Sequence, residues 1–170
     1  MSLVRNAFLL AAEKHKHQKY GDNLFLVHLY DVVEVLRSFG HTEEKYLAAA
    51  WLHDVIEDTP THYSEVQQNT NKEVAELVFA LTDEIGRNRK ERKKKTTPKL
   101  EENLDALVVK LADMLANFRD ARRNNKGFLR MYKKDFPEFE SKFRDKSSRL
   151  ESMWVEVRNT LYGETSNEPH

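Results

Sequence analysis

The sequence predicts an all-α protein, because turn-forming residues are scarce, apolar residues recur at helical spacing, and strand-like alternation is absent. Only 5 of the 170 residues are glycine and 4 are proline, and both residue types mark turns. Charged residues make up 33% and hydrophobic residues 39% of the chain, which is typical of soluble helical domains. We expect a single domain of about seven to nine helices over residues 1–162 and a mobile tail at 163–170, which has no apolar residue.

The expected helices follow from apolar spacing and from start and stop signals along the chain. Gly21 and Gly40 follow the first two helices as stop signals, and Pro60 ends the third by disfavouring helical backbone in the residue before it. Thr70 and Glu73 have the spacing of a capping box before the fourth helix. The expected helices cover residues 3–19, 26–38, 42–59, 71–84, 104–123 and 128–136, and a last run from 137 to about 161.

Composition and charge argue against several classes of protein. The 28 basic and 28 acidic residues give a net charge of +0 and an isoelectric point near 7.1, which favours neither a nucleic acid nor a membrane surface as partner. The chain has no cysteine, so it has neither disulfides nor thiolate chemistry, and we expect a cytoplasmic location. No apolar run approaches the roughly 20 residues that span a bilayer. Charged residues interrupt the N-terminal segment too early for a signal peptide, so we expect it to belong to the fold.

The stretch LHDVIEDT, residues 52–59, places an imidazole and three carboxylates at the end of an apolar helix. On a continuous helix Asp54, Glu57 and Asp58 stand at i, i+3 and i+4 and share one face. Like charges at this spacing repel each other and raise the pKa values of the carboxyl groups, and a bound divalent cation removes this conflict. The stretch therefore indicates a metal site, with a solvated helix end as the alternative.

Two other predicted helices carry a polar residue inside an apolar run. These residues are His28 in LFLVHLYDVV and Asp113 in ALVVKLADML. With His53 and Asp54 they offer two imidazole nitrogens and two carboxylates, a mixed set that suits Mn, Fe or Zn. Each residue alone has a structural interpretation, His28 as a hydrogen-bonded core histidine and Asp113 as an ion-pair partner of Lys110. We favour the metal site because three separate helices each supply a suitable ligand.

These residues resemble the H…HD…D signature of HD-domain metal-dependent phosphohydrolases. More narrowly, LHDVIEDT and VKLADMLAN resemble the hydrolase domain of RelA/SpoT-type enzymes, which remove the 3′-pyrophosphate of the alarmone (p)ppGpp. The similarity runs from about Glu13 to Asp120, and the length of the chain fits a small stand-alone hydrolase. The resemblance implies a helical HD-domain bundle that binds one divalent ion, Mn²⁺ in relatives, through His28, His53, Asp54 and Asp113.

The resemblance also implies roles for residues beyond the metal ligands. Glu57 and Asp58 match the acidic pair that lies by the attacking water, so they are the candidate catalytic residues. One of them would take the proton of that water or help to orient it. Asn117, one helical turn after Asp113, matches an asparagine that contacts the nucleotide.

The segment before His28 departs from the family pattern, which reads close to HxGQxRKxGxPYxxH. Here the sequence is HKHQKYGDNLFLVH, with Lys19 and Tyr20 where an Arg-Lys segment is expected and Asn23-Leu24 near the usual Pro-Tyr pair. That segment helps to hold the guanine base in relatives. Lys19 is therefore a candidate substrate contact, while the selectivity for the nucleotide base stays open.

A basic run at residues 87–95, RNRKERKKK, contains seven Lys or Arg residues in nine positions. One interpretation is a lid or helix that faces the substrate phosphates, with Arg89 and Arg92 as the preferred contacts. The alternatives are a solvated basic loop and a nucleic-acid patch. The run has no interleaved aromatic residue, which argues against a stacking platform for single strands.

The leading hypothesis is a metal-dependent phosphohydrolase that removes the 3′-pyrophosphate of (p)ppGpp or a related nucleotide. A second hypothesis keeps the metal site but acts on another phosphate ester, such as a nucleoside monophosphate. A third is a non-catalytic module that binds nucleic acid or protein through the basic run. The aromatic residues of the closing helices, Phe136 and Trp154 among them, are expected to form core or a homodimer face. No role is assigned to His15, His17, His41 or His62, which stand near helix ends in polar surroundings.

Overall fold

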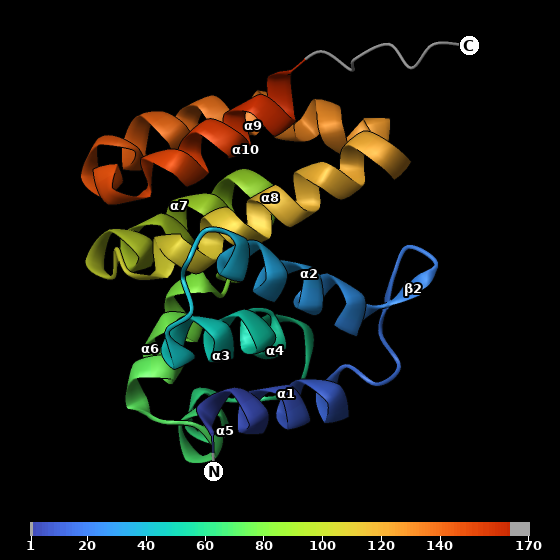
Figure 1. Cartoon of the computed structure of the whole chain (residues 1–170), viewed down its shortest axis with the longest axis vertical. Coiled ribbons are helices and arrows are strands. Elements are labelled where there is room, and N and C mark those ends of the chain that lie inside the picture. Colours follow the sequence, from blue (N-terminus) through green and yellow to red (C-terminus); the bar gives the residue numbers. More distant parts are fainter. Residues whose placement is uncertain (1, 164–170) are drawn as a thin grey trace. The chain divides into compact units, whose positions relative to one another are not determined.

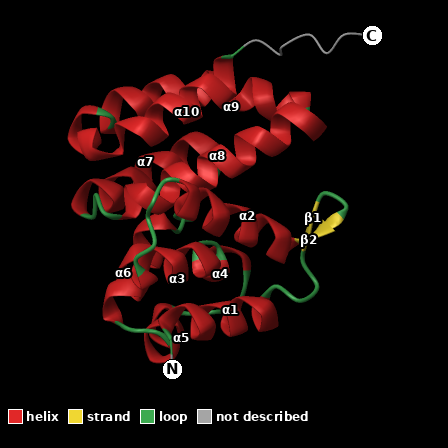
Figure 2. Ribbon diagram, viewed as in Figure 1, coloured by secondary structure: helices red, strands yellow, loops and turns green. Residues whose placement is uncertain are grey.

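The computed structural model describes residues 2–163 and is built almost entirely of helices (Figures 1 and 2), so the predicted all-α fold is confirmed. The described part of the chain holds no helix with the length and hydropathy needed to cross a membrane. In chain order the elements are α1 (Leu3–Lys14), β1 (Lys19–Tyr20), β2 (Asn23–Leu24), α2 (Phe25–Ser38), α3 (Glu44–Leu52), α4 (Val55–Asp58), α5 (Tyr63–Asn69), α6 (Lys72–Leu81), α7 (Arg89–Glu102), α8 (Ala106–Asn124), α9 (Lys126–Phe143), the 3₁₀ helix η1 (Asp145–Leu150) and α10 (Glu151–Tyr162).

The chain divides into two compact units, Met1–Asp113 and Met114–His170, and each is described by itself. The first contains everything from α1 to the first two turns of α8, and the second contains the rest of α8 with α9, η1 and α10. The single domain expected over residues 1–162 stays a prediction. The tail expected at 163–170 lies outside the described residues except for Gly163.

Helix α3 is the central element of the first unit and packs against α1, α2 and α6. Every residue from Tyr46 to Leu52 is buried, as expected for a helix that is apolar around its whole circumference. The small side chains of Ala48, Ala49 and Ala50 leave room for neighbouring helices on several sides. The C-terminal end of α3, which leads directly into His53 and Asp54, is therefore held in place by the core.

The helix predicted over residues 42–59 is interrupted in the structure. Helix α3 ends at Leu52 and α4 begins at Val55, with Asp54 at φ −103° and ψ 0° between them. The imidazole Nδ1 of His53 lies 2.8 Å from the carbonyl oxygen of Ala50, and a side chain that binds a helix carbonyl competes with the helical hydrogen bond. His53 and Asp54 thus lie in a turn, and the prediction of one continuous helix was wrong.

The first helix is shorter than predicted, since α1 ends at Lys14 rather than near residue 19. A small hairpin follows, in which Lys19 pairs with Leu24 and Tyr20 with Asn23. Gly21 has φ 58°, a left-handed conformation that glycine adopts without steric cost. Gly21 therefore makes the hairpin turn and does not end a helix, which corrects the earlier expectation.

The basic run is helical, because α7 begins at Arg89 and contains the remainder of the run. The side chain of Asn88 accepts a hydrogen bond from the N–H of Glu91 at 2.9 Å and caps the helix. Thr96 and Leu100 are the buried residues of α7, and Lys99 pairs with Glu84 at 2.7 Å. These contacts attach a strongly charged helix to the first unit. From Arg89 on, the run is therefore a helix and not a loop, while its predicted contact with the substrate phosphates stays a prediction.

The second unit has an aromatic core between α9, η1 and α10. Phe136 and Trp154 are buried with ring centroids 6.3 Å apart, and the indole N–H of Trp154 donates to Ser147 Oγ at 2.9 Å. Figure 1 shows α9 and α10 side by side, in agreement with their packing. Phe136 and Trp154 are therefore core residues, as one of the two alternatives expected, whereas Phe128 is 52% exposed. The homodimer face stays a prediction.

Candidate metal centre

The imidazole of His53 has a defined tautomer because of its position after α3. A backbone carbonyl can only accept a hydrogen bond, so the 2.8 Å contact with Ala50 places the proton on Nδ1. The other ring nitrogen, Nε2, then faces the carboxylates of Asp54 and Asp113. This arrangement, with one nitrogen held by a backbone carbonyl, is the usual way in which proteins orient a metal-binding histidine.

Three of the predicted ligands come together around this nitrogen. Asp113 Oδ1, on α8, lies 3.3 Å from His28 Nε2 and 3.5 Å from His53 Nε2. His28 comes from α2 and lies on its buried face with Phe25, Leu29 and Val32. Each of the three residues offers a ligand atom within 4.8 Å of the other two, and all three are buried. We refer to His28, His53 and Asp113 as the histidine–aspartate cluster.

The fourth predicted ligand, Asp54, lies next to the cluster but is not one of the three residues that define it. Its Oδ2 lies 3.1 Å from His53 Nε2, and its side chain is 28% exposed. Because Asp54 stands in the turn between α3 and α4, its carboxylate faces the cluster from the more open side. The structure therefore brings all four predicted ligands together.

The donor set fits a divalent ion. His53 Nε2 is buried and has no hydrogen-bond partner among the described residues, although carboxylate oxygens of Asp54 and Asp113 lie 3.1 Å and 3.5 Å away. Burial opposes protonation of His53, but the charges of these two carboxylates outweigh it and hold the pKa of His53 well above its usual value. Imidazole nitrogens and carboxylates gathered at a point that favours positive charge this strongly form a donor set suited to a divalent cation, which would take the place of the proton.

Lys110 holds the second oxygen of Asp113. Its Nζ lies 3.3 Å from Asp113 Oδ2, one helical turn away on α8, while Oδ1 faces the two histidines. Burial would raise the pKa of Asp113, but the charge of Lys110 and the nearby imidazoles of His28 and His53 outweigh it and keep the pKa well below the ordinary range. The ion pair considered for Asp113 from sequence is therefore real, and it coexists with the cluster because each oxygen has a different partner.

Replacing Lys110 with methionine is expected to destabilise the metal-free protein by about 1–2 kcal/mol, because the buried Asp113 carboxylate loses its cationic partner. The cost stays moderate because the Lys110 side chain is 29% exposed and solvent screens the pair. A bound divalent ion would restore positive charge there, so the same change should cost less when metal is present. Denaturant unfolding with and without metal measures both values. Lys72→Met serves as a control, since Lys72 is 74% exposed. Equal costs with and without metal would contradict this account.

The two candidate catalytic acids lie on α4, each with one oxygen held. Glu57 Oε2 accepts a hydrogen bond from the N–H of Asp83 at 3.1 Å, and Asp58 Oδ2 accepts one from Gln18 Nε2 at 2.6 Å. Partial burial of its carboxyl group raises the pKa of Glu57, an effect that the Asp83 hydrogen bond partly opposes. The second oxygen of each carboxylate can therefore serve as a proton acceptor while the first fixes the side chain.

Two aromatic side chains that contact His28 were not predicted from the sequence. The ring of Tyr20, on the hairpin, stacks on His28 with centroids 4.7 Å apart and planes inclined by 14°. Phe25 lies 5.5 Å from the same imidazole. Sequence analysis treated Tyr20 only as a departure from the family pattern, although an aromatic residue close to a candidate ligand could have suggested this contact. The tyrosine thus restricts the orientation of His28.

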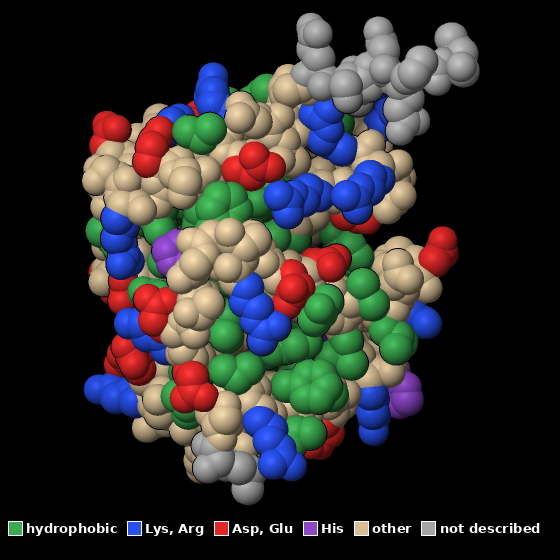
Figure 3. Space-filling view, viewed as in Figure 1, with side chains coloured by type: hydrophobic (Ala, Val, Ile, Leu, Met, Phe, Trp, Pro, Cys, Tyr) green, Lys and Arg blue, Asp and Glu red, His purple; other side chains and the backbone are tan. Residues whose placement is uncertain are grey.

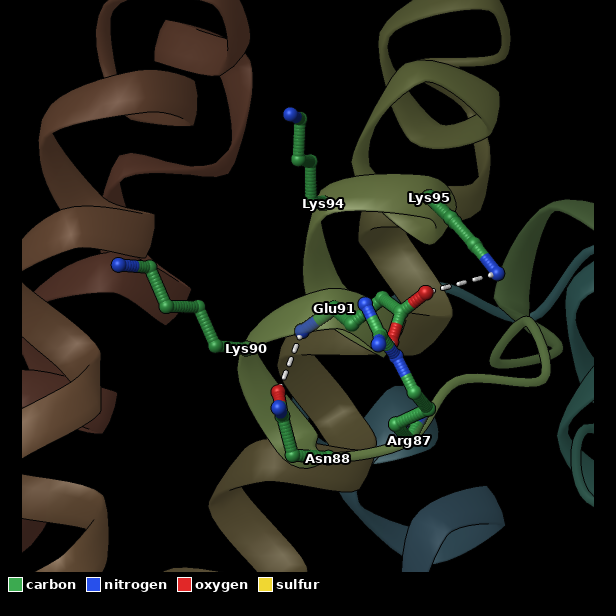
Figure 4. A pocket seen from close by; sticks show the side chains of 6 residues that line it. All are labelled: Arg87, Asn88, Lys90, Glu91, Lys94 and Lys95. Carbon is green, nitrogen blue, oxygen red and sulfur yellow. Dashed lines mark hydrogen bonds and ion pairs between the residues drawn. The ribbon is translucent and has the colours of Figure 1, made fainter.

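A surface pocket of about 510 Å³ lies at the start of α7. Figure 4 shows the side chains that line it, which are those of Arg87, Asn88, Lys90, Glu91, Lys94 and Lys95. Lys95 pairs with Glu91 at 3.3 Å, while Lys90 and Lys94 point to the same side, away from Lys95. The predicted phosphate contacts, Arg89 and Arg92, are not among the lining residues. The side chain of Arg92 instead packs on Gly86, where an added Cβ would lie 2.9 Å from its Cγ.

The two other predicted substrate contacts, Lys19 and Asn117, lie on different elements. Lys19 is exposed on β1, next to Tyr20. Asn117 lies on the part of α8 that belongs to the second unit. Both stay predictions.

The fold and the cluster define a helical protein with buried histidine and aspartate side chains arranged to suit a divalent ion. A family model described as HD domain matches residues 7–134. This chain therefore belongs to the HD domain family, and the predicted resemblance is confirmed. The family implies a divalent metal, in agreement with the chemistry of the cluster.

The chain resembles known proteins and solved structures over most of its length. The guanosine-3′,5′-bis(diphosphate) 3′-pyrophosphohydrolase MESH1 of Xenopus tropicalis is 35% identical over 137 residues, which cover 72% of this chain and 71% of that protein. MESH1 of Mus musculus is 36% identical over 118 residues, 66% of each chain. The GTP pyrophosphokinase rsh of Brucella melitensis is 35% identical over 127 residues, 69% of this chain but 17% of that protein.

A solved structure of a metazoan ortholog of SpoT, described as hydrolysing ppGpp, has the same fold. The TM-score is 0.66 at 23% sequence identity, and the match covers 98% of this chain and 89% of that one.

Proposed function

We propose that this protein is a metal-dependent hydrolase that removes the 3′-pyrophosphate of guanosine-3′,5′-bis(diphosphate) or a related nucleotide. The observation that carries the proposal is His53 Nε2, which is buried without a hydrogen-bond partner among the described residues and faces carboxylates on two sides. The similarity to MESH1, a 3′-pyrophosphohydrolase by name, supports the choice of substrate.

We further propose that one ion, Mn²⁺ in the first instance, is held by His28, His53, Asp54 and Asp113. Two imidazole nitrogens and two carboxylates suit Mn²⁺ and leave positions for water and substrate oxygens. The chemistry that such an ion supplies when bound is activation of water and polarisation of a phosphoryl oxygen. The contribution of the chain is to fix the donors, through the Ala50 carbonyl at His53 and through Lys110 at Asp113.

Glu57 and Asp58 handle the proton of the attacking water in this proposal. A general base must stand within hydrogen-bond reach of the proton that it takes, and its pKa should lie nearer to neutrality than that of an ordinary carboxylate. The pKa of Glu57 is shifted toward neutrality, as a general base requires, because partial burial of the carboxyl group raises it. The backbone N–H of Asp83 holds one oxygen of the Glu57 carboxylate and restricts the side chain.

The substrate carries several negative charges, so a nearby cation should contribute to its binding. Arg92 is the better placed of the two predicted arginines because its side chain packs on Gly86, in the loop whose Asp83 binds Glu57. We therefore retain Arg92 as a phosphate contact. Arg89, which begins α7, is the second candidate.

Replacing Arg92 with glutamine is expected to raise the KM for the nucleotide roughly 10-fold with little change in kcat, because a charge-assisted hydrogen bond to phosphate is lost. Lys90→Gln removes the same charge from the same helix on the side of the pocket in Figure 4. Steady-state kinetics of both variants at two salt concentrations separate a specific contact from general attraction. Equal increases in KM for Arg92→Gln and Lys90→Gln would contradict a specific role for Arg92.

The substrate proposal is tested by incubating the purified protein with Mn²⁺ and a panel of ppGpp, nucleoside monophosphates and nucleoside triphosphates. Release of pyrophosphate from ppGpp is the expected result, and it should stop when the metal is chelated. Release of phosphate from monophosphates alone would favour the second hypothesis, for which the altered hairpin around Tyr20 leaves room. No turnover of any nucleotide by metal-loaded protein would overturn both. Salt-dependent binding of an oligonucleotide would then support a binding module.

A further inference from the structure

Gln18, in the turn between α1 and β1, is anchored through its backbone on both sides. Its N–H donates to the carbonyl oxygen of His15 at 2.9 Å, and its own carbonyl accepts the N–H of Phe25 at 3.0 Å. These bonds tie it to the end of α1 and to the start of α2. The side chain of Gln18 therefore starts from a fixed point of the backbone.

The amide of Gln18 lies between Asp58 and His15. Nε2 donates to Asp58 Oδ2 at 2.6 Å, and Oε1 lies 2.6 Å from His15 Nδ1. A carboxylate accepts hydrogen bonds and cannot donate when ionised, so the amide nitrogen must face Asp58 and the amide oxygen must face His15. It follows that His15 Nδ1 carries a proton and donates it to Gln18.

His15 is itself immobilised, which corrects the expectation that it stands in polar surroundings. Its side chain is buried, with 1% of the residue exposed, and its ring lies 4.8 Å from that of Phe25. Its other nitrogen, Nε2, is buried without a hydrogen-bond partner among the described residues. A polar ring at this depth, directed with its one bonded nitrogen toward Gln18, indicates a positioning role.

We propose that His15 and Gln18 form a hydrogen-bond relay that holds the Asp58 carboxylate in one orientation. Asp58 is exposed at the end of a one-turn helix, where an unrestrained carboxylate would sample several rotamers. A relay anchored in the core removes that freedom before the substrate binds. His15 and Gln18 are thus positioning residues, and only their kinetic effect rests on the proposed function, in which Asp58 handles water.

The relay can be tested in the metal-free protein without any measurement of activity. Long-range ¹⁵N–¹H NMR spectra are expected to show the Nδ1-protonated state of His15, and three-bond couplings are expected to show a single χ1 rotamer for Asp58. Gln18→Met should abolish the single rotamer, whereas Gln68→Met, at an exposed position of α5, should preserve it. An unprotonated Nδ1, or a rotamer of Asp58 that is unchanged in Gln18→Met, would overturn the proposal.

The kinetic arm measures kcat, KM and Mn²⁺ affinity for the same variants. Gln18→Met is expected to lower kcat roughly 10-fold while KM and metal affinity stay within about twofold of wild type. His15→Phe should have a similar effect, and His15→Asn, which keeps a donor near the position of Nδ1, should recover most of the rate. An unchanged kcat in Gln18→Met would overturn the positioning role. If the wild type hydrolyses none of the nucleotides, the proposed function fails while the NMR measurements still decide the relay.

Discussion

Exchanging Glu57 for glutamine is expected to lower kcat by roughly 10²- to 10⁴-fold, the range that general acid–base assistance contributes. The amide keeps the shape of the side chain and can still accept the hydrogen bond from Asp83, but it cannot take a proton. Metal affinity should stay within about twofold of wild type, because Glu57 is not part of the histidine–aspartate cluster. Steady-state kinetics and calorimetric titration with Mn²⁺ measure the two quantities.

Glu76→Gln is the matched control for this change, since Glu76 is exposed on α6 and has only a weak ion pair with Lys72. Both parameters should remain at the wild-type level in that variant. Loss of metal together with activity in Glu57→Gln would show that Glu57 is a ligand and that the assignment of roles on α4 is wrong.

Exchanging Asp113 for asparagine is expected to abolish detectable metal binding and, with it, activity. Asp113 Oδ1 lies close to the Nε2 atoms of both histidines, at 3.3 Å and 3.5 Å, and the neutral amide is a much poorer ligand for a divalent ion. In the wild type, metal at about 100 times its Kd should add roughly 2.7 kcal/mol to the free energy of unfolding. This increase should be absent in Asp113→Asn.

Thermal unfolding with and without Mn²⁺ measures the effect, and Asp54→Asn is expected to behave in the same way if Asp54 completes the ligand set. Asp145→Asn, on η1 in the second unit, serves as a control that should keep the full metal response. A normal response in Asp54→Asn alone would reduce the ligand set to His28, His53 and Asp113.

The residue types of the metal centre could be predicted from sequence because each interrupts a local pattern. His28 and Asp113 are polar residues inside apolar runs, and burial of such residues requires a partner. The helices that carry them are long enough for their periodicity to identify them. The buried position of both residues therefore follows from the same pattern that gives the fold.

The interruption between α3 and α4 could not be predicted in this way. It depends on the ring of His53 binding the carbonyl of Ala50, a local competition that residue spacing does not reveal. The hairpin was missed because its strands have two residues each, too few for any alternation. The contact of Gln18 with Asp58 joins polar residues separated by 40 positions, and neither hydrophobic periodicity nor capping rules address such a pair.

The short helix α4 has a consequence for local unfolding of the protein. Helix α3 is buried along its length, whereas α4 has four residues, of which only Val55 is buried. Because local opening requires the least free energy where few buried contacts are lost, the amide protons of α4 should exchange with solvent much faster than those at the C-terminal end of α3. His53 and Asp54 would then mark the boundary between α3, which unfolds only together with the core, and α4, which can unfold locally by itself.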